Sequence, residues 1–121
     1  MTRTIVVLAI GIVALDAVEA LIARSARFDY AWFMPVQIVV YLAIGFALRR
    51  LGTTLRMTAF AAAITGLVEG TAGEWAAVAL GGTPATPLTV MIVAVPIAVA
   101  IEVGLALGGF AVASIGKPAQ P

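Results

Sequence analysis

An apolar run that carries two acids, residues 58–80, places the strongest constraint on how this chain can fold. As a helix it is long enough to cross the roughly 30 Å hydrocarbon core of a bilayer. It nevertheless contains Glu69 and Glu74 and no basic residue. Acids within a spanning helix are costly and almost always face a protein interior or a water-filled cavity. The run therefore predicts a helix bundle that encloses carboxyl groups.

Three further apolar runs of similar length indicate the fold class. The chain has 121 residues, of which 63% are hydrophobic and 11% charged, and this is too apolar for a soluble domain of its size. We predict an all-α integral membrane protein with four transmembrane helices in a compact bundle, forming a single domain. The expected helices are residues 5–23, 31–48, 58–80 and 88–113 of the domain 1–121, followed by a disordered tail, residues 114–121.

Basic residues are divided unequally between the two ends of the predicted bundle. One end has only Arg24 and Arg27. The other end, which holds both termini and the connection between the second and third helices, has Arg3, Arg49, Arg50, Arg56 and Lys117. Because basic residues are concentrated on the cytoplasmic side of membrane proteins, we predict that both termini are cytoplasmic. The expected location is a bacterial-type inner membrane or a plasma membrane.

Cysteine and histidine are both absent from the chain. This excludes disulfides, thiolate chemistry and the usual zinc, copper and haem ligands, so we expect no metal and no cofactor. The net charge is only +1 and no basic patch contains interleaved aromatic residues, so we expect no nucleic-acid partner. The expected partners are the lipid bilayer and a small-molecule ligand or a proton.

Four polar side chains are predicted to meet near the middle of the membrane. The first and third helices run in the same direction, so a rise of about 1.5 Å per residue places Asp16 and Glu69 at matching heights. The second and fourth helices run the opposite way, which brings Tyr41 and Glu102 to the same level. We expect these four residues to carry proton exchange or acid–base chemistry. Loss of Glu69 is expected to be the most damaging, ahead of Asp16 and Glu102.

A second polar layer is predicted one turn nearer the outer face. It contains Glu19, Glu74 and Gln37, and no Lys or Arg shares either layer. Because like charges repel and low dielectric disfavours ions, several of the acids should be protonated at neutral pH unless a cation is bound. We expect Glu19, Glu74 and Gln37 to contact a ligand. Trp75, which points towards lipid or the interface, is included among these ligand contacts.

Small residues form two stripes that favour close helix packing. One stripe lies on the third helix and comprises Gly66, Gly70, Gly73 and Ala77. The other repeats every fourth residue of the fourth helix and comprises Ala100, Gly104 and Gly108. The second stripe is roughly 160° from Glu102 around the helix, so it predicts a homodimer contact that leaves the acid facing the bundle interior.

Together these patterns favour a small proton-coupled membrane transporter, or a binding protein, for a cationic or polar, partly apolar compound. One alternative is a membrane-embedded enzyme that uses paired carboxyl groups as acid and base in an isomerisation, cyclisation or epoxide opening. Another alternative is an accessory subunit whose acids only pair helices. A cavity that reaches water would favour transport, and a closed apolar pocket facing lipid would favour an enzyme.

Overall fold

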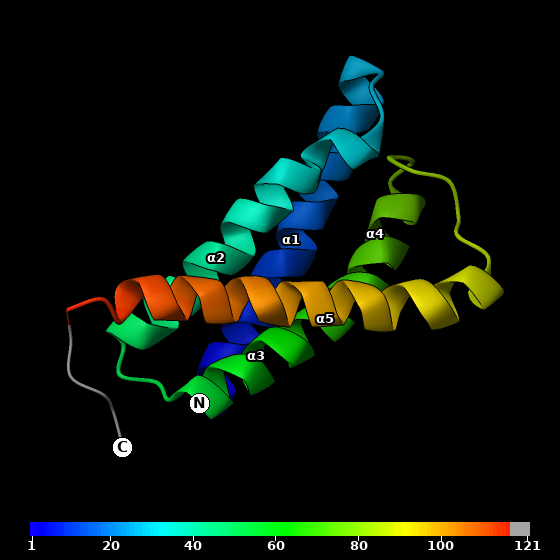
Figure 1. Ribbon diagram of the computed structural model, residues 1–121. Coiled ribbons are helices and arrows are strands. Elements are labelled where there is room, and N and C mark those ends of the chain that lie inside the picture. The colour runs from blue at the N-terminus through cyan, green and yellow to red at the C-terminus, as the bar shows by residue number, and fades with distance from the viewer. Residues whose placement is uncertain (117–121) are drawn as a thin grey trace.

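The computed structural model describes residues 1–116, and their regular structure is entirely helical. The elements are α1 (Thr2–Ala26), the 3₁₀ turn η1 (Tyr30–Phe33), α2 (Met34–Arg50), α3 (Leu55–Val68), the π-helical segment η2 (Glu69–Gly73), α4 (Glu74–Ala79) and α5 (Leu88–Ala113), as Figure 1 shows. Because α3, η2 and α4 follow one another without a break, they form one bent helix. The predicted all-helical, four-helix arrangement is therefore confirmed. Residues 117–121, including Lys117, lie outside the described part of the chain.

Three helices are long and apolar enough to cross a membrane: Thr2–Ala26, Tyr30–Arg50 and Leu88–Ala113. Their outward surfaces carry large apolar side chains, such as Ile10 (65% exposed) and Ile92 (66% exposed). A soluble protein of this size would bury such residues, whereas hydrocarbon is their natural surroundings. The structure thus indicates a membrane protein.

The helix ends differ from the expected ones for local reasons. The first helix begins at Thr2 and continues to Ala26, where Arg27 adopts a left-handed conformation (φ 58°) and closes the helix with a backbone hydrogen bond. The second helix begins at Met34, because the preceding residues form the 3₁₀ turn η1. The side chain of Asp29 caps that turn by accepting a hydrogen bond from the Ala31 amide at 2.9 Å. The fourth expected helix, residues 88–113, has the predicted bounds.

The third expected helix, residues 58–80, contains an unexpected π-helical segment. The Thr71 hydroxyl donates to the Leu67 carbonyl at 2.7 Å, and such bonds bend helices. A π segment accommodates an extra residue, so the side chains after it are rotated relative to those before it. A methyl group added at Gly66 would strike Glu102 of α5, whereas one added at Gly73 would strike Asp16 of α1. The small residues therefore do not share the single face predicted for a regular helix. Gly66 faces α5, whereas Gly73 faces α1.

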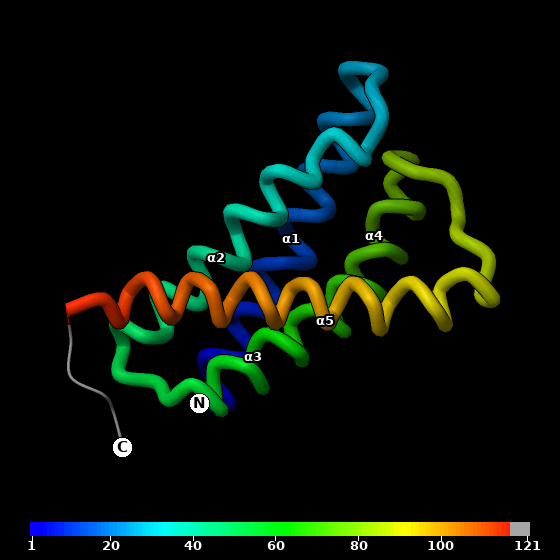
Figure 2. Tube along the Cα trace, in the orientation of Figure 1, coloured from blue at the N-terminus to red at the C-terminus, as the bar shows by residue number. Residues whose placement is uncertain are grey.

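Helix α5 is packed on α2 and α3, whereas α1 is packed on α3, η2 and α4. The closest approach is between α2 and α5, where Gly45 lies against the backbone of Ala106 and Gly109 against that of Leu42. A core of five buried residues lies beneath this contact: Ile12, Tyr41, Ile44, Leu48 and Ala61. In Figure 2 the first turns of α5 (yellow) extend away from α2, and the later turns (orange) cross it. Residues of both helices line a cleft.

The small-residue stripe on α5 is largely uncovered. Ala100 and Gly104 are exposed, and a methyl group added at Gly104 would meet nothing within 4 Å. Gly108 is partly covered, because such a group there would lie 3.7 Å from the Leu42 side chain. The contact between two copies through Ala100, Gly104 and Gly108 therefore remains a prediction.

Candidate functional site

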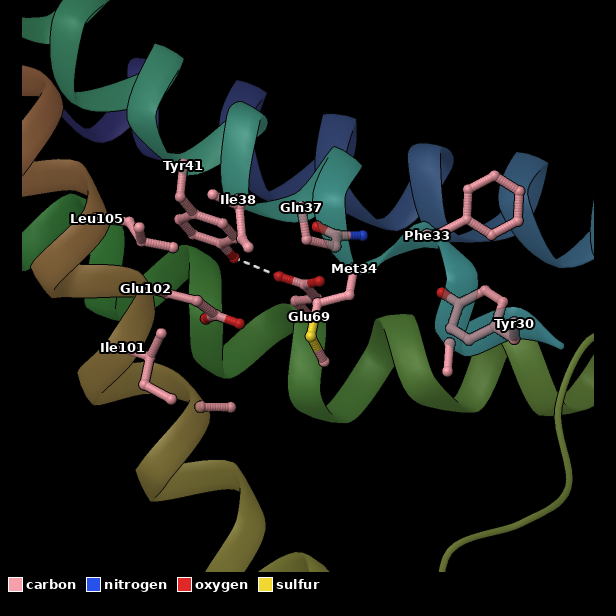
Figure 3. A pocket seen from close by; sticks show the side chains of 12 residues that line it. Tyr30, Phe33, Met34, Gln37, Ile38, Tyr41, Glu69, Ile101, Glu102 and Leu105 are labelled. Carbon is pink, nitrogen blue, oxygen red and sulfur yellow. Dashed lines mark hydrogen bonds between the residues drawn. The ribbon is translucent and has the colours of Figure 1, made fainter.

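A cleft of about 390 Å³ lies between α2, η2 and α5. Its lining, drawn in Figure 3, comprises Tyr30, Ala31, Phe33, Met34, Gln37, Ile38, Tyr41, Glu69, Ala98, Ile101, Glu102 and Leu105. The lining begins at η1, at the start of α2, and continues along α2 to Tyr41. No Lys or Arg belongs to this described lining. The cleft therefore has mainly apolar walls and an acidic inner end.

The inner end of the cleft is formed by Tyr41, Glu69 and Glu102. The hydroxyl of Tyr41, which is fully buried, donates a hydrogen bond to Oε2 of Glu69. The carboxyl group of Glu102 lies beside both the Tyr41 hydroxyl and the Glu69 carboxyl. We refer to Glu69 and Glu102 as the carboxyl pair. Three helical segments that are distant in sequence thus converge on one acidic site.

Gly66 makes room for this convergence. A Cβ at Gly66 would lie 2.2 Å from Oε2 of Glu102, which is closer than any two such atoms can approach. Because Gly66 has no side chain, the acid of α5 can lie directly over the backbone of α3. The small residue one turn before Glu69 therefore positions the second carboxyl group beside the first.

The carboxyl pair has no basic partner in the cleft. Arg49, the buried arginine of α2, lies near the other end of that helix, where its Nε donates to Ser114 Oγ at 2.7 Å and its guanidinium lies over the Phe110 ring. Two adjacent carboxylates in a low-dielectric interior are strongly unfavourable when both are ionised. Either a proton or a bound cation must therefore reduce their charge.

Asp16 and Glu19 form a second acidic group on the α1 side of the bundle. Both side chains are only 2% exposed, and neither lines the cleft. Nε2 of Gln37 donates to Oδ1 of Asp16 at 3.1 Å and to Oε1 of Glu19 at 2.8 Å. Asp16 lies over Gly73, where an added Cβ would be 2.1 Å from Oδ2. The hydrogen bonds thus join Asp16 and Glu19 to Gln37, and Tyr41 to Glu69, beside which Glu102 lies.

Three of the four predicted ligand contacts lie away from the cleft: Glu19, which belongs to the second acidic group, Glu74 and Trp75. Glu74 accepts a hydrogen bond from the Thr86 hydroxyl at 2.9 Å, so it ties α4 to the connection before α5. Trp75 is 73% exposed on the outside of the bundle. The structure therefore brings Gln37, Tyr41, Glu69 and Glu102 to the cleft, but not Asp16, Glu19, Glu74 or Trp75.

Tyr30 is a cleft residue that sequence reasoning did not select. It lines the outer part of the cleft. Its hydroxyl group approaches Asp16. In the sequence it is one of several aromatic residues expected at the membrane interface. Asp29, which precedes Tyr30, could have indicated this position from the sequence, because an Asp often accepts a hydrogen bond from the backbone two residues later and so forms a tight turn. Here Asp29 accepts from the Ala31 amide, and the turn redirects the chain.

The described residues contain no group of three or more acidic side chains placed to hold a metal ion. The donors at the inner end of the cleft are two carboxyl groups and a phenol, a set that suits proton exchange and the binding of an organic cation.

No protein family, no curated protein and no solved structure matches this chain. The geometry of the cleft and its acids is therefore the basis on which a function can be argued.

Proposed function

We propose that the protein binds a small organic cation in the cleft in exchange for a proton, as a proton-coupled transporter or binding protein. The observation that carries this proposal is the carboxyl pair, Glu69 and Glu102, at the inner end of an apolar cleft without a basic lining residue. A proton on the pair removes one of its two negative charges in the empty site. A cation that enters replaces that proton, so the net charge of the site is the same in both states.

The walls of the cleft favour an amphiphilic ligand. Aliphatic and aromatic side chains such as Phe33, Ile38 and Ile101 line it, and its volume of about 390 Å³ is of the size that holds a small organic molecule. The ring of Phe33 can also attract a cation that passes over its face. An apolar body with a positive group at one end complements these walls and the acidic inner end.

The extent of the cleft supports exchange with the membrane surface. Its lining begins at Tyr30 in η1, at the end of the bundle, and reaches Tyr41 in the third turn of α2. Tyr41 is the seventh residue after Met34, so the acidic end lies roughly 10 Å deeper than the first residue of α2. A site that connects an end of the bundle to its middle suits transport or binding better than a closed pocket facing lipid.

Binding of benzyltrimethylammonium to the purified protein tests the proposal. We expect its affinity, measured by isothermal titration calorimetry in detergent, to rise with pH, because protons compete with the cation for the carboxyl pair. Neopentylbenzene, the uncharged molecule of the same shape, is the matched control and should bind without this pH dependence. Equal binding of the two compounds, or cation binding that does not change with pH, would refute the proposal.

An acid–base enzyme acting on an apolar substrate is a second candidate. It is favoured by the hydrogen bond from Tyr41 to Glu69 beside a second carboxyl group, because one acid can donate a proton while its neighbour accepts one. The apolar walls would hold a substrate such as an epoxide. Hydrolysis of styrene oxide by the wild-type protein, lost in Glu102→Gln, would support this candidate. Absence of turnover would leave cation binding as the function of the carboxyl pair.

We also propose that residues 55–79, the bent helix formed by α3, η2 and α4, are a fourth membrane span and that both termini are cytoplasmic. Twenty-five helical residues extend about 37 Å, enough to cross the hydrocarbon core. The chain has no cysteine, so single-cysteine variants report the topology directly. An impermeant thiol reagent added outside intact cells should label Ser25→Cys and not Leu51→Cys. The reverse labelling would show that the termini are outside.

A further inference from the structure

Asp16 and Glu19 are enclosed in the bundle and separated from the cleft. Each is 2% exposed, and each accepts a hydrogen bond from the same amide nitrogen, Nε2 of Gln37. Gln37 itself lines the cleft beside Glu69, and in Figure 3 its amide oxygen is on the Glu69 side of the group. One side chain therefore contacts both the enclosed acids and the cleft.

Two oxygen atoms of this group are buried without a hydrogen-bond partner: Oε2 of Glu19 and Oε1 of Gln37. Both amide hydrogens of Gln37 are already directed at the acids, so neither orphaned oxygen can receive one of them. A buried, unpartnered carboxylate oxygen carries the full cost of lost hydration. A proton on the carboxyl group removes this charge.

The charges around the group also favour a proton. Asp16 is near Glu69 of η2, Glu74 of α4, Tyr30 of η1 and Glu19 of its own helix. The acids disfavour an ionised Asp16, whereas the Tyr30 hydroxyl and the Gln37 amide favour it as hydrogen-bond donors, and none of these neighbours supplies a positive charge. An ionised Asp16 or Glu19 would therefore face only like charges unless a cation entered the cleft nearby.

We propose that Asp16, Glu19 and Gln37 form an occluded proton site, separate from the cleft, that gives up its proton when a cation binds beside Glu69. This inference rests on the proposed function. The O–H bond of the carboxylic acid breaks, water takes up the proton, and the positive charge of the cation bound nearby partly offsets the charge of the new carboxylate. Gln37 couples the two sites, because a ligand that displaces its side chain also changes the hydrogen bonds to both acids.

Infrared spectroscopy of the full-length protein in lipid vesicles tests the occluded site without requiring a ligand. Carboxylic acids and carboxylates absorb at different frequencies, so a buried protonated acid is directly visible. At neutral pH the wild-type protein should show a carboxylic acid band that loses amplitude in Glu19→Gln or in Asp16→Asn. Glu74→Gln, which changes an acid outside the group, is the matched control and should retain that amplitude. Thermal unfolding should show that all three variants remain folded.

Addition of benzyltrimethylammonium then tests the coupling. The wild-type band should lose amplitude on binding, and the loss should be clearly smaller in the Asp16→Asn/Glu19→Gln double variant while the cation still binds. A band that is absent, or that neither single variant changes, would overturn the occluded site whether or not the cation binds. A cation that binds the wild-type protein without changing the part of the band assigned to Asp16 and Glu19 would overturn the coupling. A wild-type protein that does not bind the cation would refute the proposed function, and with it the coupling, while the ligand-free spectra still decide the occluded site.

Discussion

Glu69→Gln is expected to lower the affinity for benzyltrimethylammonium at least tenfold, which corresponds to about 1.4 kcal/mol, and to flatten its pH dependence. The amide keeps the size of the side chain and still offers an oxygen to the Tyr41 hydroxyl, so the fold should survive. The exchangeable proton and half of the negative charge of the carboxyl pair are removed. Calorimetric titrations of the wild-type protein and the variant at two pH values give both quantities.

Glu74→Gln is the matched control for this experiment. Glu74 lies on the same bent helix, five residues after Glu69, but it accepts a hydrogen bond from Thr86 and does not line the cleft. Its substitution should leave both cation affinity and pH dependence unchanged. If Glu69→Gln assembles as the wild type and keeps unchanged cation binding, proton release and turnover, the acid is structural, and both the transport and the enzyme candidates fail.

Periodicity and depth were sufficient to predict much of the architecture. Four apolar runs predicted four helices, because each run has a spanning length and an acid within it must face other helices. Height along the bundle also explains why Glu69, Glu102 and Tyr41 could be predicted as neighbours: the rise per residue of an α-helix is nearly constant. The structure brings those three together at the end of one cleft.

Rotation about the helix axis could not be predicted in the same way. The π-helical segment η2 turns α4 relative to α3, so Gly73 faces Asp16 while Gly66 faces Glu102. A regular helix of about 100° per residue cannot reproduce this change. Side-chain reach was a second limit, because height gives the level of a residue but not its hydrogen-bond partners. Gln37 extends to Asp16 and Glu19, so Asp16 shares a hydrogen-bond donor with Glu19, although it is also near Glu69.

Gly45→Ala is expected to be the most destabilising single methyl addition in the bundle. The new Cβ would lie 1.7 Å from the Ala106 carbonyl oxygen and 2.5 Å from its carbon, and neither backbone atom can move without moving a helix. Overpacking of this kind costs about 1–3 kcal/mol, against the small gain that Ala gives over Gly in a helix. The variant should unfold at a lower temperature or denaturant concentration than the wild-type protein in the same detergent.

Gly11→Ala separates this packing effect from helix propensity. Gly11 is also within a helix, but a Cβ there would meet nothing within 4 Å, so the substitution should be neutral or slightly stabilising.

Gly45→Ala should also affect the cleft, because Tyr41 is one turn before Gly45 on α2, and Glu102 is one turn before Ala106 on α5. Forcing the helices apart at this crossing separates the phenol from Glu102, so cation affinity should fall together with stability. If Gly45→Ala instead unfolds like Gly11→Ala and binds the cation as the wild type does, the α2–α5 contact does not hold the cleft in its active geometry.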